Sequence, residues 1–348
     1  MKPMSATLLQ AWERRGPFAL ALLPITLLYY LAVALRRSLY RLGLLPSQQL
    51  DCAVIVVGNA VVGGAGKTPT TIGLVRHLQS RGLVVGVVSR GYGRSQRQVC
   101  AVAPDSDAAE VGDEPLLIAQ ATGAPVFVGA MRHQAAGALL DAHPDTQVLV
   151  CDDGLQHYAL YRDLEICVFD DRGCGNGWLL PSGPLREPWP RRPLLRVGQS
   201  NARLLVLHTA SPAAFAGYQA QRRLADEAHD SQGRRVLLRG LQGPLLALAG
   251  LARPQAFFDA LTASGLQLAK TLPLPDHFDF ARLDAAQLQG YQVLCTEKDA
   301  AKLWRRWPQA LAVPLVQTME PGFFLALDQR LDAILAAKLS SPHGHQTA

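Results

Sequence analysis

The stretch VIVVGNAVVGGAGKTPTT, residues 54–71, decides the fold class of this chain. Residues 54–57 are a short β-branched apolar run that predicts a buried strand. A glycine-rich turn follows, ends in Gly66-Lys67-Thr68, and leads directly into an apolar pattern typical of a helix. Strand, glycine-rich loop, Lys-Thr and helix in this order predict a cradle for nucleotide phosphates. Its glycines let backbone N–H groups turn toward the anion, and the helix presents its partly positive N-terminus.

Within this cradle, we expect Lys67 to reach the β- and γ-phosphates and the Thr68 hydroxyl to ligate Mg²⁺. The spacing departs from the strict G-x-x-x-x-G-K-[ST] pattern, because Val61 stands where the first glycine is expected. Gly63 and Gly64 supply the flexibility instead. The alternative, a glycine-rich turn with an incidental lysine, does not explain the order of the elements. The predicted nucleotide-binding residues are Gly63, Gly64, Ala65, Gly66, Lys67, Thr68 and Pro69.

Length and composition narrow the class of protein. The 348 residues are enough for two packed domains, and 49% hydrophobic with 18% charged residues exclude a disordered chain. The formal net charge of +6 suits an anionic partner such as a nucleotide or an anionic membrane surface. Basic residues are not interleaved with aromatic ones, so we expect no nucleic-acid partner. The six cysteines form no C-x-x-C pair, which fits reduced, buried thiols in a protein that faces the cytosol.

The amino-terminal segment PFALALLPITLLYYLAVAL, residues 17–35, contains no charged residue. As a helix it would be roughly 28 Å long, close to the thickness of a bilayer core. Arginines stand at both ends, so the positive-inside rule gives no orientation, and Pro24 favours a kink. We expect residues 1–47 to form a membrane-associating helix and linker, monotopic or entering the cytoplasmic leaflet as a single helix. A buried helix of the soluble fold is the alternative.

The rest of the chain alternates between strand-like and helical patterns, which predicts an α/β fold with a P-loop-type parallel sheet and helices on both faces. We expect a nucleotide-binding α/β domain at 48–235 and a second, smaller α/β domain at 236–348 that completes the cleft. The polar residues 211–235 are expected to form a helix or a connection. Strands are predicted at 54–57, 84–88, 126–128, 148–151, 165–169, 204–207, 245–249 and 292–295, and helices at 70–80, 114–121, 134–141, 254–265 and 299–306.

Two acidic residues, Asp152 and Asp153, follow the apolar run 148–151 and precede Gly154-Leu-Gln-His157. An acid at the end of an apolar strand downstream of a phosphate loop is the Walker-B arrangement. Parallel sheets bind ligands at the carboxyl ends of their strands, so we expect one carboxylate to face the Mg²⁺ held by Thr68. The other would then meet a substrate hydroxyl or a basic partner. A solvated turn after a strand is the alternative.

Two further glycine-containing segments are suited to ligand binding. Ser89-Arg-Gly-Tyr-Gly-Arg94 would allow the close approach of an anion or a sugar, or is a plain surface loop. Gly112-Asp-Glu-Pro115 opens a helix, and Asp113 is either a reactive acid or the N-cap of that helix.

Two loops complete the set of candidate segments. GNGWLLPSGPLRE, residues 175–187, is dense in turn-forming residues and predicts a rigid loop. Arg186 in that loop could clamp a phosphate, with a surface ion pair to Glu187 as the alternative. The second loop, Leu274-Pro-Asp-His277, carries in His277 a side chain of the type that titrates near neutral pH.

These motifs occur in one order, from the phosphate loop through SRGYGR, GDEP, DDGLQH, GNGWLLPSGPLRE and LPDHF to TEKDAAKL. In this the chain closely resembles the tetraacyldisaccharide 4′-kinase family, the lipid A 4′-kinases of Gram-negative bacteria, over essentially its whole length. The resemblance implies transfer of the γ-phosphate of ATP, with Mg²⁺, to the 4′-hydroxyl of a tetraacyldisaccharide 1-phosphate, which forms lipid IVA. It also implies a glycolipid substrate, a place at the cytoplasmic face of the inner membrane, and no obligate protein partner.

The resemblance also assigns roles to individual side chains. Asp113 would be the general base that accepts the 4′-hydroxyl proton, with His277 as its partner in a dyad. The implied catalytic residues are Asp113, His277, Lys67, Asp152, Asp153 and Arg186. The implied metal ligands are Thr68, Asp152 and Glu187, and the implied substrate-binding residues are Tyr92, Arg132 and His157.

A P-loop ATPase or GTPase that switches a protein partner at the membrane is the alternative function. A GTPase would need a guanine-binding loop similar to N-K-x-D. Thr296-Glu-Lys-Asp299 has a comparable form, but Glu297 occupies the lysine position. A membrane-bound scaffold without catalysis would leave Lys67, Thr68 and Asp152 unexplained.

Overall fold

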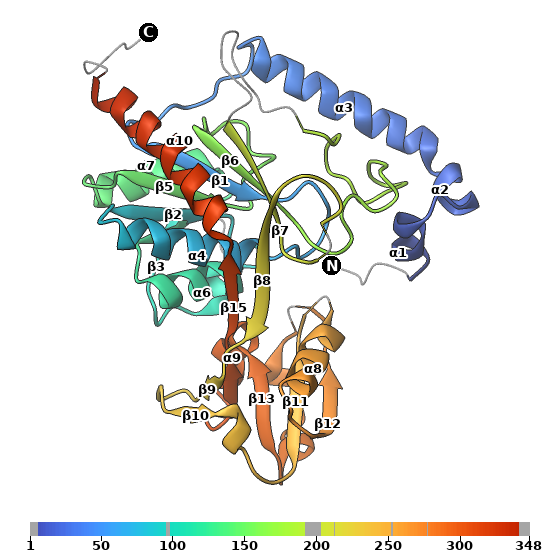
Figure 1. Ribbon diagram of the computed structural model, residues 1–348. Helices are drawn as coiled ribbons and strands as arrows, with labels where there is room; N and C mark the ends of the chain where they lie inside the picture. The colour runs from blue at the N-terminus through green and yellow to red at the C-terminus, as the bar shows by residue number, and fades with distance from the viewer. Residues whose placement is uncertain are drawn as a thin grey trace.

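Two β-sheets organise the part of the chain that the computed structural model describes, residues 6–94, 98–191, 203–211, 213–251, 253–276 and 278–340. Figure 1 shows the unit built on the larger sheet above the unit built on the smaller one, with β8 (Tyr218–Leu224) and β15 (Leu315–Met319) running side by side between them. The predicted α/β fold with a parallel-rich sheet and a second, smaller α/β unit is confirmed.

The larger sheet has nine strands among the described residues, in the order β15-β8-β7-β6-β1-β5-β2-β4-β3. All neighbours pair in parallel except β15 with β8 and β3 with β4, which are antiparallel edge pairs. The remaining strands are β1 (Ala53–Gly58), β2 (Val85–Ser89), β3 (Cys100–Val102), β4 (Val126–Val128), β5 (Val148–Asp152), β6 (Leu164–Phe169) and β7 (Leu204–His208).

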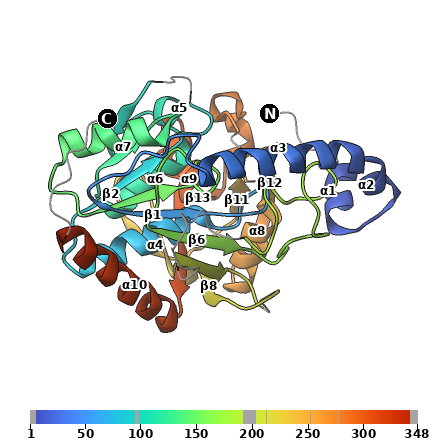
Figure 2. The same ribbon diagram turned by 90° about the horizontal axis from the view of Figure 1, so that it is seen from above.

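Strand β1 explains why helices cover both faces of this sheet. Its side chains alternate: Ile55 and Val57 belong to one apolar core, whereas Val54 and Val56 belong to the other. The first core includes α4 (Lys67–Ser80), α6 (Asp113–Thr122) and α10 (Pro321–Ser340), and the second includes α7 (Arg132–Ala142). In Figure 2, α7 and α10 accordingly lie on opposite sides of the strands. A strand buried on both faces is apolar throughout, as residues 53–57 are.

The smaller sheet has the strand order β10-β9-β14-β13-β11-β12. The helices α8 (Pro254–Ala263) and α9 (Glu297–Leu303) belong to this smaller unit. The short helix α5 (Ala108–Val111) belongs to the larger unit. The strands are β9 (Glu227–His229), β10 (Arg235–Leu237), β11 (Leu245–Ala249), β12 (Leu268–Pro273), β13 (Gln292–Thr296) and β14 (Leu311–Val313), with single 3₁₀ turns at Leu238–Gly240, Phe280–Arg282 and Ala285–Leu288.

The path of the chain differs from the expected division in two respects. Residues 218–224 and 227–229, expected to be helix or connection, are strands β8 and β9. Moreover, the chain returns to the larger sheet at β15, and α10 packs on the first core through Phe323, Leu327 and Leu331. The expected boundary at residue 235 therefore does not coincide with the exchange between the two sheets. The polar composition of 218–224 conceals a strand because that strand belongs to a half-exposed two-stranded ribbon.

The amino-terminal segment is broken at Leu22 into α2 (Pro17–Ala21) and α3 (Leu23–Arg41), after α1 (Ala6–Glu13). In Figure 1, α3 lies at the end of the molecule farthest from the smaller sheet. Thr26 Oγ1 donates to Ser182 Oγ at 2.7 Å, and the Tyr29 hydroxyl donates to the Arg186 carbonyl at 2.9 Å. Among the described residues, no helix combines the length and the apolarity that a membrane crossing requires.

The role of α10 in the larger unit gives a stability prediction. We expect Phe323→Ala to lower the free energy of unfolding of this unit by about 3–5 kcal/mol, because the ring is completely buried and its loss leaves a cavity. Leu325→Ala on the same helix, where the side chain is 62% exposed, should change it by less than about 0.5 kcal/mol. Urea unfolding followed by far-ultraviolet circular dichroism measures both; equal effects would contradict the placement of α10.

Candidate active site

The phosphate loop leaves β1 at the edge of the sheet where β5 also ends, because the two strands pair in parallel with Val57 opposite Asp152. Gly63 and Gly66 have φ values of 104° and 86°, which favour glycine, and α4 begins at Lys67 directly after Gly66. The N-terminus of α4 therefore faces the space above the loop, as an anion-binding site requires. Thr68 occupies the second position of this helix.

The side chain of Asp153 lies between two cations of the predicted site. Its Oδ1 is 3.6 Å from Lys67 Nζ and 3.1 Å from Arg186 Nη1. Burial raises the pKa of Asp153, but Lys67, Arg186 and Arg132 together outweigh burial and hold that pKa below its usual range. Asp153 itself has a positive φ of 47°, so the turn after β5 is strained at this residue. Three of the predicted catalytic side chains, Lys67, Asp153 and Arg186, are thus in one cluster.

Asp152 is completely buried and faces α4. Thr71 Oγ1 donates to Asp152 Oδ1 at 2.9 Å, while Asp152 Oδ2 has no hydrogen-bond partner among the described residues. Burial, followed by the negative charges of Glu114 and Asp153, raises the pKa of Asp152 to about 7. A buried carboxylate oxygen without a donor is suited to a cation. Asp152 therefore fits the Mg²⁺ role that the sequence predicts for it.

Asp113 occupies the first position of α6, where a lysine of the smaller unit contacts it. Lys302 Nζ, on α9, lies 2.7 Å from Asp113 Oδ2. One turn earlier on the same helix, Lys298 Nζ lies 2.9 Å from Asp276 Oδ1. Burial lowers the pKa of Lys298, but Asp276, Glu114 and Asp113 outweigh it and raise that pKa. The smaller unit thus brings two lysines toward the acidic start of α6.

His277, the predicted partner of Asp113, lies outside the described residues. Its neighbour Asp276 is held by the ion pair with Lys298 on α9, the helix that also carries Lys302. The loop that contains His277 therefore starts next to the helix that contacts Asp113. The Asp113–His277 dyad remains a prediction.

His157 and Arg132 lie together behind the Asp153 turn. The Arg132 backbone N–H donates to His157 Nε2 at 3.2 Å, and Arg132 Nη2 donates to the Asp153 carbonyl at 3.2 Å. Burial, followed by the charges of Arg132 and Arg162, lowers the pKa of His157 to about 3. His157 is therefore a neutral hydrogen-bond acceptor near neutral pH. Both residues belong to the cluster, and their contact with substrate remains a prediction.

Glu187 is buried between two arginines. Its Oε2 accepts a hydrogen bond from Arg191 Nη1 at 2.5 Å and a short one from Arg37 of α3. The ring of Tyr158 lies beside the same arginines, 5.9 Å from Arg191 Cζ and from Arg37 Cζ. The metal-ligand role of Glu187 remains a prediction, and in this conformation its carboxylate joins α3 to the Arg186 loop.

Among the described residues, no three His, Cys, Asp or Glu side chains converge as a metal-binding group.

Tyr92, on the loop after β2, is 47% exposed. Its neighbour Gly91 packs on the start of α6, since a Cβ on Gly112 would lie 3.0 Å from Gly91 Cα. The SRGYGR and GDEP motifs are therefore adjacent in space, and the substrate contact of Tyr92 remains a prediction.

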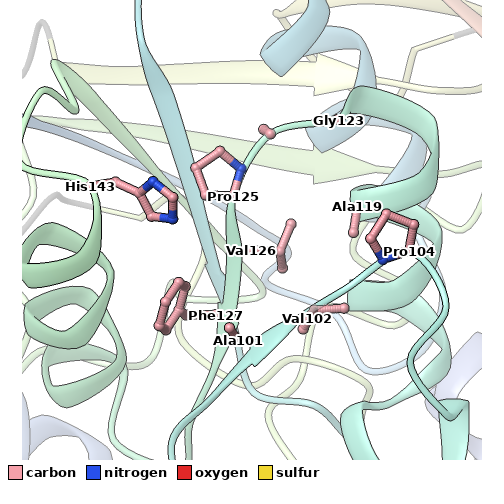
Figure 3. A pocket seen from close by; sticks show the side chains of 10 residues that line it. Ala101, Val102, Pro104, Ala119, Gly123, Pro125, Val126, Phe127 and His143 are labelled. Carbon is pink, nitrogen blue, oxygen red and sulfur yellow. The ribbon is translucent and has the colours of Figure 1, made fainter.

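A hollow of about 270 Å³ beside β3, β4 and α6 is separate from this cluster (Figure 3). It is lined by the end of β3, by residues 123–127 before and at the start of β4, and by His143 at the end of α7, so it lies at the amino ends of the parallel strands. The phosphate loop and the two aspartates lie at the opposite, carboxyl ends.

The family model for tetraacyldisaccharide-1-P 4′-kinase matches residues 18–339 of this chain. The chain belongs to this family. The predicted enzyme class, a kinase, is thereby confirmed, and a P-loop switch for a protein partner is not favoured.

Individual relatives agree with this membership. The tetraacyldisaccharide 4′-kinase of Polaromonas naphthalenivorans (strain CJ2) is 56% identical over 99% of this chain and 100% of its own length. That of Acidovorax sp. (strain JS42) is 55% identical over 95% of this chain and 96% of its own length. A crystal structure of LpxK from Aquifex aeolicus in complex with ATP superposes with a TM-score of 0.77 at 26% identity, covering 91% of this chain and 99% of that one.

Several residues that contact the predicted site residues or the phosphate loop were not predicted from the sequence. Lys298 and Lys302 are four residues apart, so they share one face of α9; their spacing within TEKDAAKL is the signal that could have suggested them. Thr71, one turn after Thr68, is the hydroxyl that bonds Asp152. Arg172 Nη1 donates to the Val62 carbonyl at 3.1 Å, and Arg172 has no motif that would single it out.

The raised pKa of Asp152 predicts a pH effect on stability. The folded protein favours protonated Asp152, so this stabilisation is complete below the ordinary pKa of 3.8 and is lost as the pH rises through about 7. We expect the free energy of unfolding of wild type, measured without nucleotide or Mg²⁺, to fall between pH 4 and pH 8 by ~3 kcal/mol more than that of Asp152→Asn. Urea unfolding at several pH values measures this. Asp145→Asn, at an exposed site, should follow wild type; an Asp152→Asn curve parallel to wild type would refute the assignment.

Proposed function

We propose that this chain transfers the γ-phosphate of ATP to the 4′-hydroxyl of a tetraacyldisaccharide 1-phosphate, a lipid A precursor, and so forms lipid IVA. The observation that supports this most is the cluster of Lys67, Arg186, Asp152 and Asp153 at the carboxyl ends of β1 and β5. Glu114, which follows Asp113 at the start of α6, is close enough for its charge to act on Asp152. This cluster occurs in a chain that belongs to the 4′-kinase family.

Phosphoryl transfer asks a protein mainly for positioning and for charge stabilisation. The loop N–H groups and the α4 N-terminus would hold the β- and γ-phosphates, and Lys67 would follow them. Lys67 and Arg186 now share Asp153, so an incoming triphosphate would compete with that carboxylate for both cations. Asp152 and Thr68 would hold Mg²⁺, which supplies charge neutralisation at the phosphates when it is bound.

The acceptor hydroxyl must lose its proton as the new P–O bond forms. Asp113 is 7% exposed at the helix start that faces the second unit, and Lys302 is its cationic partner at 2.7 Å. In this position Asp113 would accept the proton of the 4′-hydroxyl, while Lys302 and His277, from the smaller unit, would orient the carboxylate. Partners on two units would couple the approach of these units to formation of the complete site.

An apolar surface near the site supports a lipid-linked substrate. Leu20, Ile25, Leu28, Leu31 and Leu35 of α2 and α3 are each at least 50% exposed. Beside them, a groove of about 560 Å³ between α3 and the Trp178 loop is lined almost entirely by apolar side chains. Such a surface, flanked by arginines, suits the interface of an anionic membrane. We propose that it rests on the cytoplasmic face of the inner membrane.

The direct test is incubation of the purified protein with Mg-ATP and a tetraacyldisaccharide 1-phosphate, followed by mass spectrometry and phosphorus NMR of the lipid. A product with a new phosphate at the 4′-position supports the proposal. ATP hydrolysis without lipid phosphorylation, stimulated instead by a protein partner, would overturn it.

The role of Asp113 gives a kinetic prediction. We expect Asp113→Asn to lower kcat by about 10²–10⁴-fold with less than about threefold change in KM for ATP, because a general base acts in the transition state. Steady-state kinetics with both substrates measure this. Glu110→Gln, an exposed change of equal charge on α5, is the matched control. A kcat close to wild type would reassign Asp113 to the interface with Lys302.

The role of α3 gives a membrane-binding prediction. We expect the double variant Leu28→Glu and Leu31→Glu to weaken binding to vesicles containing phosphatidylglycerol at least ~100-fold. Each leucine side chain that enters the membrane contributes about 1.5–3 kcal/mol to the binding free energy. Co-sedimentation measures the binding. The control carries Leu325→Glu and Leu339→Glu, two exposed leucines of α10. Equal binding of both variants would show that α3 is not the contact.

A further inference from the structure

Arg222, on the ribbon strand β8, reaches the phosphate loop although 155 residues separate it in sequence from Lys67. Its Nη2 donates to the carbonyl oxygen of Ala65 at 2.6 Å. The same guanidinium donates from Nε to Gln317 Oε1 at 3.1 Å, on the paired strand β15. Arg222 is half-buried, whereas its neighbour Arg223 has a side chain that is 61% exposed. Successive side chains of a strand point to opposite faces, so Arg222 points toward the phosphate loop and Arg223 points away from it.

The bond to Ala65 has a consequence for the peptide that joins Ala65 to Gly66. In a trans peptide the C=O and the following N–H point in opposite directions. A donor that fixes the Ala65 carbonyl therefore also fixes the direction of the Gly66 N–H. Because Gly66 immediately precedes α4, its N–H is one of the groups that a phosphate cradle uses.

A second side chain acts on the same carbonyl. Thr209 Oγ1, after β7, lies 3.1 Å from the Ala65 carbonyl oxygen and 3.1 Å from the Phe169 carbonyl oxygen, so its single proton is shared between these two acceptors. Thr209 carries no charge and is buried, so replacing it with valine removes a donor to the peptide without removing a positive charge from the site. Arg222 on β8 and Thr209 after β7 thus both reach the Ala65 carbonyl, which restrains the direction of this peptide.

The ribbon also holds the first turn of α4. Gln317 Nε2 donates to Thr70 Oγ1 at 2.6 Å, and Thr70 Oγ1 donates to the Gly66 carbonyl at 2.9 Å. The peptides on both sides of Gly66 are thus connected to the Arg222–Gln317 pair. A Cβ on Gly66 would lie 1.6 Å from Arg222 Nη2, so only glycine leaves room for the guanidinium here.

We propose that Arg222 is a positioning residue for the nucleotide: together with Thr209 it fixes the Ala65–Gly66 peptide so that the Gly66 N–H faces the phosphates. The inference rests on the proposed ATP-dependent function. It differs from a direct role, in which the guanidinium itself would contact the phosphates. Asp170 and Asp171 are the acidic groups whose charges act on Arg222, which further lowers the attraction between that guanidinium and an anion.

The test is the affinity for an ATP analogue with an imido link between the β- and γ-phosphates, measured by calorimetry with Mg²⁺ and without glycolipid. We expect Arg222→Gln to raise Kd about tenfold and Thr209→Val about three- to fivefold. The double variant should raise Kd less than the product of the two, because both side chains act on one carbonyl. Arg223→Gln, the matched loss of charge on the same strand, should leave Kd unchanged. KM for ATP should rise with Kd, whereas KM for the glycolipid should stay constant.

The results for these variants distinguish a positioning role of Arg222 from a direct contact with the phosphates and from a failure of the proposed function. Wild type that does not bind the analogue would overturn the proposed function rather than this inference. An Arg222→Gln Kd equal to that of Arg223→Gln would overturn the positioning role. A loss in Arg222→Gln with no loss in Thr209→Val would assign Arg222 a direct charge contact instead. If Arg222→Gln does not fold, Arg222→Lys, which keeps the charge and one N–H donor group, should raise Kd about threefold; an unchanged Kd would refute the proposal.

Discussion

The parallel pairing of β1 with β5 is the constraint on which the site depends. It places Val57 opposite Asp152, so the loop that follows one strand and the aspartates that follow the other leave the sheet at the same edge. The pairing is stable because both strands are buried on both faces, between the helices of the two apolar cores. The buried, apolar strands β1 and β5 therefore determine where the site residues lie.

Charge is distributed around this edge in two different ways. Asp153 shares Lys67 and Arg186, whereas Asp152 has only the Thr71 hydroxyl and one oxygen without a donor among the described residues. The two aspartates are adjacent in sequence, yet their pKa values shift in opposite directions because the strand end turns one inward and the other toward the cations. Adjacent groups with divergent environments are typical of functional sites.

Two segments remote from the phosphate loop contact predicted site residues outside that loop. The smaller unit reaches Asp113 through Lys302, and exposed ion pairs join Arg305 to Asp107 and Arg253 to Asp171 across the same interface. At the opposite end, α3 is bonded to the Arg186 loop through Tyr29. The Arg186 loop in turn contacts the segment after β1, because the Arg186 N–H donates to the Ala60 carbonyl at 2.7 Å. The apolar helix surface, the Arg186 loop and the phosphate loop are thus linked through direct contacts. A lipid-linked acceptor held on α3 would lie on the same side of the fold as the loop that bears Arg186.

By itself, the sequence determined the parallel α/β class, the phosphate loop and the order of the motifs, since strand burial and glycine-rich turns are local patterns. Most predicted strands and helices lie within a few residues of the observed ones. Only the tertiary structure decided that β8 and β15 form a ribbon, that α10 returns to the larger unit, and that Lys302, Thr71 and Arg222 meet the site. Those contacts join residues far apart in the chain, and polar side chains on a half-exposed ribbon have no periodicity that reveals their partners.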